Sequence, residues 1–409
     1  MADPKKFDRP SAPDRLRLPA MGLEAEFSLV LDGEPARPED VFGSPRDFIR
    51  GELVHRQGRS YQLPNGSAAY FDTGVIEVAT PVIELAPGCA ARAGRSLWET
   101  IQVLRADLDA WDAGHGHVTR LVGFSAHYNV SFALPAGEPA QGRTIEGLAH
   151  LLTYILPAPV MLLAANRRST GVGVRPRTDR IEVTCDFTPS PPLTIATATL
   201  IAGVVREAMT WPSYALDELA RRGIPLMRDF APMPHTSRKG WLARFDCYAQ
   251  SPFTCDIDIA MWPTLRDGDL SLRAIAGRTA RHFWRSIGRM ADPLTLRLIA
   301  SVLRGRSLSL LELEDRPQAY EDVGRLCAWD ARSAPAQLAR SRYERVVMHA
   351  IAGKPLRMNG RGLQPVKMEG WSAVVFEDEE HRQETIAIDD LVPHLEEWEE
   401  ALPGPVRAA

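Results

Sequence analysis

The sequence predicts an α+β fold with a small β-containing domain at the carboxy terminus. Strand-like and helical segments follow one another along the 409 residues without the regular strand–helix–strand order of a doubly wound sheet. Four strand-like segments carry acidic, imidazole or other polar side chains on one face and apolar side chains on the other. From about Pro365 the pattern changes to short strands around a charged turn. We expect a main domain over residues 1–340 and a small domain over residues 341–409.

The individual elements follow from the periodicity of apolar residues. A run of β-branched and aromatic residues predicts a strand over 70–81, and a helix is expected over 91–112, where Gly114 stands at a typical stop. The apolar stretch 148–165 contains Pro157 and Pro159, which predicts a buried helix that breaks near the prolines. The remaining expected elements are strands at 21–32, 122–134, 181–187, 365–368, 372–376 and 385–388, and a buried helix at 193–211.

The composition excludes several classes of protein. Apolar residues make up 45% and charged residues 24% of the chain, as in ordinary globular proteins. A net charge of −4 argues against general nucleic-acid binding, and five cysteines without a Cys-x-x-Cys pair suit a reducing compartment. Residues 1–18 lack the apolar core of a signal peptide, and 148–165 is too short and too broken to span a bilayer. We therefore expect a cytoplasmic protein without nucleic-acid or membrane partners.

The segment 70–81 is the most informative part of the chain. Tyr70 and Asp72 share a face of a regular strand, whereas Glu77 would fall on the opposite face. Gly74 can supply a bulge or a turn that brings Glu77 back. Acids in an apolar strand are costly unless something pairs with them, and a divalent cation is a usual partner. This segment is therefore expected to belong to a functional site.

Three other strands repeat the pattern. Glu24 and Glu26 share one face of the first strand, His127 shares a face with Asn129 and Ser131, and Arg180 shares a face with Glu182. A sheet with one side in water explains any single strand. Four strands together, with arginines gathered at 167–180, instead describe a metal–nucleotide site on a concave sheet, because carboxylates and imidazole suit Mg²⁺ or Mn²⁺ and arginines suit phosphate.

Several short motifs resemble a known superfamily. The sequences Gly22-x-Glu24-x-Glu26, Glu77-x-x-Thr80-Pro81, His127-x-Asn129 and Arg180-Ile181-Glu182 resemble the glutamine synthetase and glutamate–cysteine ligase superfamily. Within it, the segment Met21–Phe27, Asn65-Gly66 followed by Tyr70-x-Asp72, and Gly370-Trp371 are similar to the branch of the Pup–protein ligase and the Pup deamidase/depupylase. Ala68 and Val75-Ile76 depart from that branch, which has an arginine and a His-Pro pair there.

The resemblance implies a curved antiparallel sheet that cradles ATP and Mg²⁺ or Mn²⁺, flanked by helices. By position, Asp72 matches the catalytic aspartate of the branch, and Thr80 and Trp371 match residues that contact ATP. The candidate metal ligands that the resemblance implies are Glu24, Glu26, Tyr70, Glu77, His127 and Glu182. Arg175 or Arg177, together with Arg180, are the candidate phosphate-binding arginines.

Four functional hypotheses follow. The first is an ATP-dependent carboxylate–amine ligase, in which a γ-phosphoryl group activates the carboxylate of a peptide or protein tail and Asp72 takes a proton from the attacking amine. The second is a depupylase- or deamidase-like hydrolase, or a phosphatase, in which Asp72 acts as nucleophile or activates water. Asp72-Thr73-Gly74 also matches the aspartic-protease triplet, but the chain has no second copy. The retained acids argue against a fourth possibility, a degenerate binding module.

Overall fold

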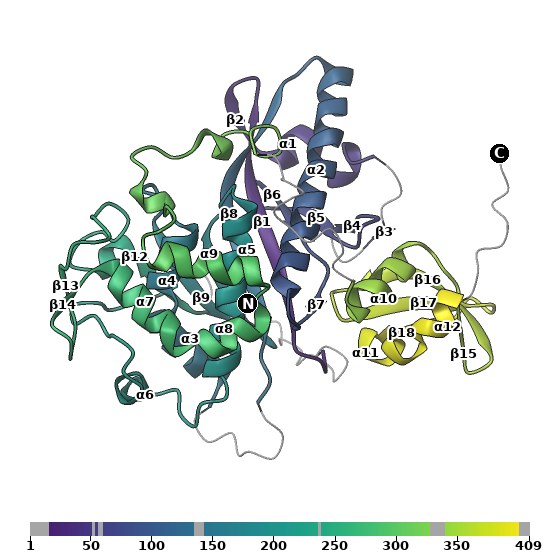
Figure 1. Cartoon of the computed structure of the whole chain (residues 1–409). Helices are drawn as coiled ribbons and strands as arrows, with labels where there is room; N and C mark the ends of the chain where they lie inside the picture. The colour runs from purple at the N-terminus through teal and green to yellow at the C-terminus, as the bar shows by residue number, and fades with distance from the viewer. Residues whose placement is uncertain are drawn as a thin grey trace, which may run out of the picture.

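The computed structural model describes residues 16–50, 54–55, 60–134, 143–235, 239–327 and 340–400. A large curved sheet with its helices forms one part of the molecule, and a small sheet with three helices forms the other (Figure 1). Every pair of neighbouring strands in both sheets is antiparallel. The predicted α+β fold, an antiparallel cradle with a small carboxy-terminal sheet, is therefore confirmed.

Within the described residues, the large sheet contains twelve strands. In spatial order, its main path is β11 (Met233–Pro234), β12 (Trp241–Arg244), β9 (Gly171–Pro176), β10 (Arg180–Asp186), β8 (Thr119–Ser131), β1 (Ala20–Leu31), β6 (Val75–Ala79), β5 (Ala68–Asp72), β4 (Tyr61–Gln62) and β3 (Val54–His55). Two short strands, β2 (Glu34–Ala36) and β7 (Ile83–Glu84), also pair with β1. The long strands β1 and β8 lie at the centre, so residues on either of them are neighbours of residues from both halves of the sheet.

Helices cover one face of the large sheet and leave the other face open. The helices α2 (Cys89–His115) and α5 (Pro191–Ala208) pack against the central strands. The other helices of this part are α1 (Pro38–Phe42), α3 (Ile145–Ile155), α4 (Pro157–Ala164), α6 (Asp217–Arg221), α7 (Leu272–His282), α8 (Trp284–Met290) and α9 (Pro293–Leu303). Along β1, Leu23, Ala25 and Phe27 point into the helix-covered core. The intervening Glu24 and Glu26 consequently point to the open face.

The stretch 70–81 is a hairpin and not one continuous strand. The strands β5 and β6 are joined by Thr73 and Gly74, both of which have positive φ, at 49° and 94°. Two consecutive residues of this conformation make the tight turn whose twist matches antiparallel strands. The turn, one of the two alternatives expected at Gly74, places Glu77 directly opposite Tyr70 on the same face.

The structure extends one predicted helix and confirms the predicted break in another. The helix α2 runs through Gly114 and ends at Gly116, because Gly116 and not Gly114 takes the left-handed conformation that closes a helix. The apolar stretch 148–165 breaks as predicted, into α3 and α4, which meet at an angle of 61°. Among the described residues no single helix is long and apolar enough to cross a membrane, although this bent pair passes by length and composition.

The small sheet consists of β15 (Leu356–Met358), β16 (Arg361–Glu369), β17 (Ala373–Asp378) and β18 (Gln383–Ala387). The helices α10 (Arg342–Ile351), α11 (Ile388–Leu391) and α12 (Leu395–Glu400) complete its core. Ala20, the first residue of β1, belongs to this core, and Leu16, Leu18 and Val82 pack against it. The segment that leads into the central strand therefore connects the two parts. The boundary at 340/341 stays a prediction.

Candidate active site

The central strands bring the predicted acids into two adjacent rows on the open face. In one row Glu24 lies between Ala79 on β6 and His127 on β8. In the next row Glu26 lies between Glu77 on β6 and Ser125 on β8. Residues directly opposite each other on antiparallel strands point to the same side of the sheet. The strand register therefore places the carboxylates of Glu24, Glu26 and Glu77 and the imidazole of His127 close together on β1, β6 and β8.

The hairpin extends the second row by one strand and adds the predicted aspartate at its end. Tyr70 on β5 pairs directly with Glu77, and its hydroxyl hydrogen-bonds the Glu77 carboxyl. Asp72 is the last residue of β5 and accepts a 2.9 Å hydrogen bond from the hydroxyl of Thr73. Despite its place at the end of β5, its carboxylate approaches those of Glu26 and Glu77.

His127 is the central contact of the cluster. Its Nδ1 lies 3.0 Å from Oε2 of Glu24 and 3.8 Å from Oε1 of Glu77. On the other side of the ring, Nε2 lies 3.6 Å from Oε1 of Glu26. The side chain of His127 is only 8% exposed. Burial alone lowers the pKa of His127, but the hydrogen bond and negative charge of Glu24 and the charge of Glu26 outweigh it and raise that pKa.

Glu77 is the acid that burial affects most. Its burial, followed by the negative charge of Glu24, raises its pKa to about 8, against the partial opposition of His127 and Tyr70. Because the ordinary value is 4.5, the isolated cluster holds Glu77 largely protonated at neutral pH. The cluster therefore contains more carboxyl groups than the nearby positive charge can stabilise in the ionised form.

Two overlapping groups in this cluster fit a divalent cation. Ligand atoms of Glu24, Glu77 and His127 lie within 4.8 Å of one another, and so do those of Glu26, Asp72 and Glu77. Carboxylate oxygens and a neutral imidazole are ligands that Mg²⁺ and Mn²⁺ accept. A cation would also supply the missing positive charge that the raised pKa of Glu77 indicates. The donor set therefore fits the predicted metal.

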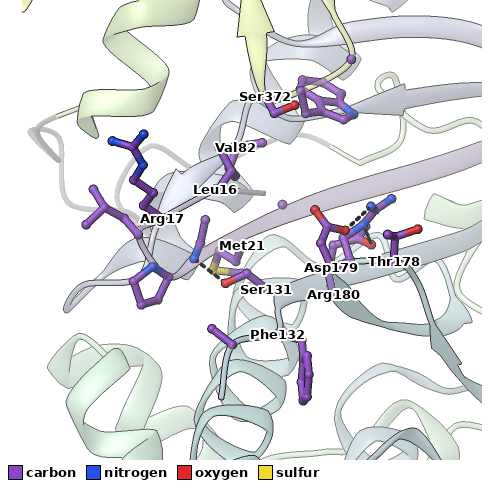
Figure 2. Close-up of a pocket in the computed structure, with 18 of the residues that line it drawn as sticks. Leu16, Arg17, Met21, Val82, Ser131, Phe132, Thr178, Asp179, Arg180 and Ser372 are labelled. Carbon is purple, nitrogen blue, oxygen red and sulfur yellow. Dashed lines mark hydrogen bonds and ion pairs between the residues drawn. The ribbon is translucent and has the colours of Figure 1, made fainter. Parts of the chain in front are cut away.

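A pocket of about 620 Å³ begins at this cluster and extends to the small domain. Figure 2 shows Arg180 and Asp179 on one wall, with Ser372 and Val82 on the opposite side. Glu24 lines the pocket as well as belonging to the acidic cluster. Two further predicted residues, Thr80 and Trp371, also line it. The hydroxyl of Thr80 accepts a 3.0 Å hydrogen bond from the amide of Leu23 and so ties β6 to β1 at the mouth.

Only one of the three candidate phosphate-binding arginines lines this pocket. Arg180 faces the cavity, and its Nε donates a 2.9 Å hydrogen bond to Oδ1 of Asn129. Arg175 and Arg177 instead form ion pairs with Glu182, with the Arg177 pair at 2.7 Å. The Glu182 side chain is 1% exposed. In the described part of the chain, Glu182 belongs to neither cation group, and its charge is neutralised by these two arginines.

Several residues of the site were not singled out by the sequence. Ser125 donates a 2.6 Å hydrogen bond to Glu26 and lies 3.2 Å from Nε2 of His127. Asp179 pairs with Arg180 at 3.1 Å. The segment 16–19, whose main chain is tied to the small domain, forms another wall of the pocket. Strand alternation could have indicated Ser125, because it lies two residues before His127 on the same face of β8, whereas no local pattern marks residues 16–19.

The fold and the site together define a curved antiparallel cradle with an acidic cluster on its open face. No protein-family model matches the chain, and no curated protein matches its sequence. Among solved structures, the complex between the prokaryotic ubiquitin-like protein Pup and its ligase PafA matches with a TM-score of 0.50. The two sequences are 13% identical over 95% of this chain and 94% of that chain. At this identity the match shows that the chain has the fold of that ligase.

Proposed function

We propose that this protein is an ATP- and Mg²⁺-dependent ligase that joins a carboxylate to an amine. The observation that carries the proposal is the position of Glu24, which lines the 620 Å³ pocket and also belongs to the acidic cluster. A nucleotide in the pocket would have its phosphates at the cluster and its base toward Trp371. The shared fold with a Pup ligase supports the same assignment.

The position of each residue suggests which part of the nucleotide or which ion it would bind. Trp371 offers a ring for the base, and Arg180 offers a guanidinium for phosphate oxygens. Burial lowers the pKa of Arg180, but the nearby acids Asp179, Glu24 and Glu182 raise it by more. The net pKa lies above the ordinary value, so Arg180 keeps its positive charge. Glu24, Glu77 and His127, with Glu26 beside them, would hold Mg²⁺, which would neutralise the charge of the phosphates, and Asp72 would stay free to act as a base.

The reaction that suits this arrangement has two steps. An oxygen of the donor carboxylate attacks the γ-phosphorus of ATP, the bond to the β-phosphate oxygen breaks, and ADP leaves. The amine nitrogen then attacks the acyl carbon, the bond from that carbon to the phosphate oxygen breaks, and inorganic phosphate leaves. Asp72 takes the proton that the amine loses, because it lies at the end of the cluster farthest from the pocket. Arg180 stabilises the negative charge on the transferring group.

The donor we propose is a protein or peptide carboxylate, by analogy with the Pup bound to the structural neighbour. The test combines purified protein, ATP, Mg²⁺, Pup as the carboxylate donor, and hydroxylamine as a small amine. We expect hydroxamate formation and ADP release, both dependent on Pup. Phosphate release without any dependence on hydroxylamine, and with no hydroxamate, would favour a hydrolase. A calorimetric titration that gives no heat with ATP and Mg²⁺ would contradict both.

A further inference from the structure

The turn that follows Asp72 is bonded to a residue outside the sheet. The two turn residues, Thr73 and Gly74, lie between the closing pair of the hairpin, Asp72 and Val75. In a two-residue hairpin the amide of the second turn residue takes no part in the strand ladder, so it can donate elsewhere. The amide of Gly74 donates a 2.8 Å hydrogen bond to Oε1 of Glu39, which lies 35 residues earlier on α1.

The conformation of this turn needs support from its surroundings. Thr73 has a φ of 49°, which a β-branched residue rarely adopts. Strained residues of this kind persist only where several contacts fix them. One contact is the 2.9 Å hydrogen bond from the hydroxyl of Thr73 to Asp72, and the other is the bond from Gly74 to Glu39. A carboxylate acceptor makes the second bond stronger than one between neutral groups.

The helix that contains Glu39 is itself anchored to the strand that contains Asp72. The helix α1 lies next to β2 at one end of the large sheet (Figure 1). Its residue Phe42 is 5% exposed, and the ring centres of Phe42 and Phe71 lie 6.4 Å apart. Phe71 precedes Asp72 on β5 and also stacks on the ring of Phe48. Aromatic packing on the helix-covered face therefore fixes the distance between α1 and the end of β5.

The Glu39 carboxylate has no other function visible in the described part of the chain. It does not line the nucleotide pocket, and it belongs to neither cation group. Its Oε2 is buried and makes no hydrogen bond within the described residues. The side chain of Arg37 lies 3.9 Å away but is 63% exposed, so this ion pair contributes little. The bond to the Gly74 amide is the contact that gives Glu39 a role.

We propose that Glu39 is a positioning residue, which holds the Asp72 carboxylate in place through the turn that follows β5. This inference rests on the proposed function, in which Asp72 takes a proton from the amine. The carboxylate of Asp72 approaches that of Glu26, and like charges repel. Asp72 is the last residue of its strand, where the ladder restrains it least. The bond from Gly74 to Glu39 opposes displacement of this end of the hairpin.

Glu39→Ala should slow the reaction without weakening nucleotide binding. Initial rates are measured with ATP, Mg²⁺, Pup and hydroxylamine. A shift of about 1 Å at a reacting group can reduce a rate by about 10²-fold, so we expect kcat to fall about tenfold to hundredfold. KM for ATP should be nearly unchanged, because Glu39 does not line the pocket. Glu39→Gln should retain most of the activity, since its amide oxygen still accepts the hydrogen bond from Gly74.

The matched control is Asp40→Ala. Asp40 is the next residue of the same first turn of α1, and it is exposed. Its removal takes a carboxylate from α1 but leaves the bond to Gly74 in place, so kcat should stay at the wild-type value. An equal fall of kcat in Asp40→Ala, or equal losses in Glu39→Gln and Glu39→Ala, would overturn the inference. So would a loss of ATP affinity parallel to the fall in kcat, since general destabilisation affects both.

An NMR measurement tests the bond at the turn without any reaction. The chain contains two Thr-Gly pairs, Thr73-Gly74 and Thr170-Gly171. Labelling threonine carbonyls with ¹³C and glycine amides with ¹⁵N therefore isolates the amide signals of these two glycines. We expect Gly74 to exchange its amide proton slowly in the wild type and in Glu39→Gln, and much faster in Glu39→Ala, because hydrogen bonding protects an amide. The Gly171 signal should be the same in all three proteins.

The outcomes separate this inference from the proposed function. If the wild type ligates no amine but the exchange of Gly74 depends on Glu39 in this way, the ligase proposal fails and the role of Glu39 at the turn stands. If amines are ligated and Glu39→Ala changes neither kcat nor the exchange, the proposed function stands and Glu39 has no positioning role. Equal exchange of Gly74 in the wild type and in Glu39→Ala refutes the inference whatever the enzyme assay shows.

Discussion

Glu77 lies directly opposite Glu26 across β6 and β1, so two carboxylates share the floor of the cradle while Tyr70 hydrogen-bonds Glu77 from the other side. Burial and the nearby charge of Glu24 raise the pKa of Glu77 to about 8. Without a bound cation, the ionised carboxylates repel one another. A bound cation would offset this repulsion. The first two predictions follow from this relationship.

Cation binding should release protons. At pH 7 Glu77 is mostly protonated, and Mg²⁺ binding requires the carboxylate. We expect the association constant for Mg²⁺ to rise by up to about tenfold per pH unit below pH 8 and to level off above it. Calorimetry in buffers of different ionisation enthalpy should show this proton release directly. Glu77→Gln should bind Mg²⁺ weakly and without pH dependence, and an unchanged pH dependence in that variant would assign the proton to another group.

The stability of the cation-free protein should fall as pH rises from about 5 to 8. Glu77 keeps its proton up to about pH 8 when folded but loses it near its ordinary value of 4.5 when unfolded. The folded state therefore binds more protons in this window, and raising the pH favours unfolding by at most about 1.4 kcal/mol per pH unit. Urea denaturation at pH 5 and pH 8 measures the difference. Glu77→Gln should flatten the dependence, and Mg²⁺ should restore stability at pH 8.

Asp72→Asn should abolish ligation and preserve nucleotide binding. The amide cannot accept the proton of the amine, and general-base catalysis contributes on the order of 10²–10⁴ in rate. Asp72 does not line the pocket, so the Kd for ATP should change by no more than severalfold. Asp246→Asn, a change at an exposed residue beyond β12, serves as control. Ligation at the wild-type rate in Asp72→Asn would remove Asp72 from the mechanism.

Trp371→Ala should weaken ATP binding by about tenfold or more, because stacking of a base on an aromatic ring contributes about 1–3 kcal/mol. Trp371 follows Gly370, whose φ of 56° marks the turn between β16 and β17 and directs this segment to the pocket. Fluorescence titration with ATP and with inorganic triphosphate distinguishes base from phosphate contacts. Affinity for triphosphate should be unaffected, and an equal loss for both ligands would argue against stacking.

Removing one partner of the buried ion pair between α2 and α10 should weaken the attachment of the small domain. The Nε of Arg92 donates hydrogen bonds of 2.9 and 3.0 Å to the two oxygens of Glu344, and the Glu344 side chain is completely buried. Arg92→Leu leaves the Glu344 charge uncompensated and should cost about 3–5 kcal/mol, measured by urea denaturation. The double change Arg92→Leu with Glu344→Leu should recover most of this loss. An additive, larger loss in the double variant would contradict the pairing argument.

The alternation of residue types along single strands was sufficient to predict the polar face. Because side chains on a strand alternate sides, the sequence alone paired Glu24 with Glu26 and His127 with Asn129, and left the aliphatic residues between them for the core. The same local reasoning predicted the broken helix at 148–165 and the short strands of the small domain. These features depend on backbone periodicity and on proline, which act within a few residues.

What only the tertiary structure decided depends on contacts between distant segments. Strand order placed Glu26 between Glu77 and Ser125, and the turn at Thr73 and Gly74 set Tyr70 opposite Glu77. Neutralisation of Glu182 by two arginines left Arg180 alone of the three to line the pocket. The register between β1 and β8 shifts between Glu26 and Phe27, which leaves Phe124 without a partner on β1. Strand register and core packing are non-local, so no local sequence pattern encodes them.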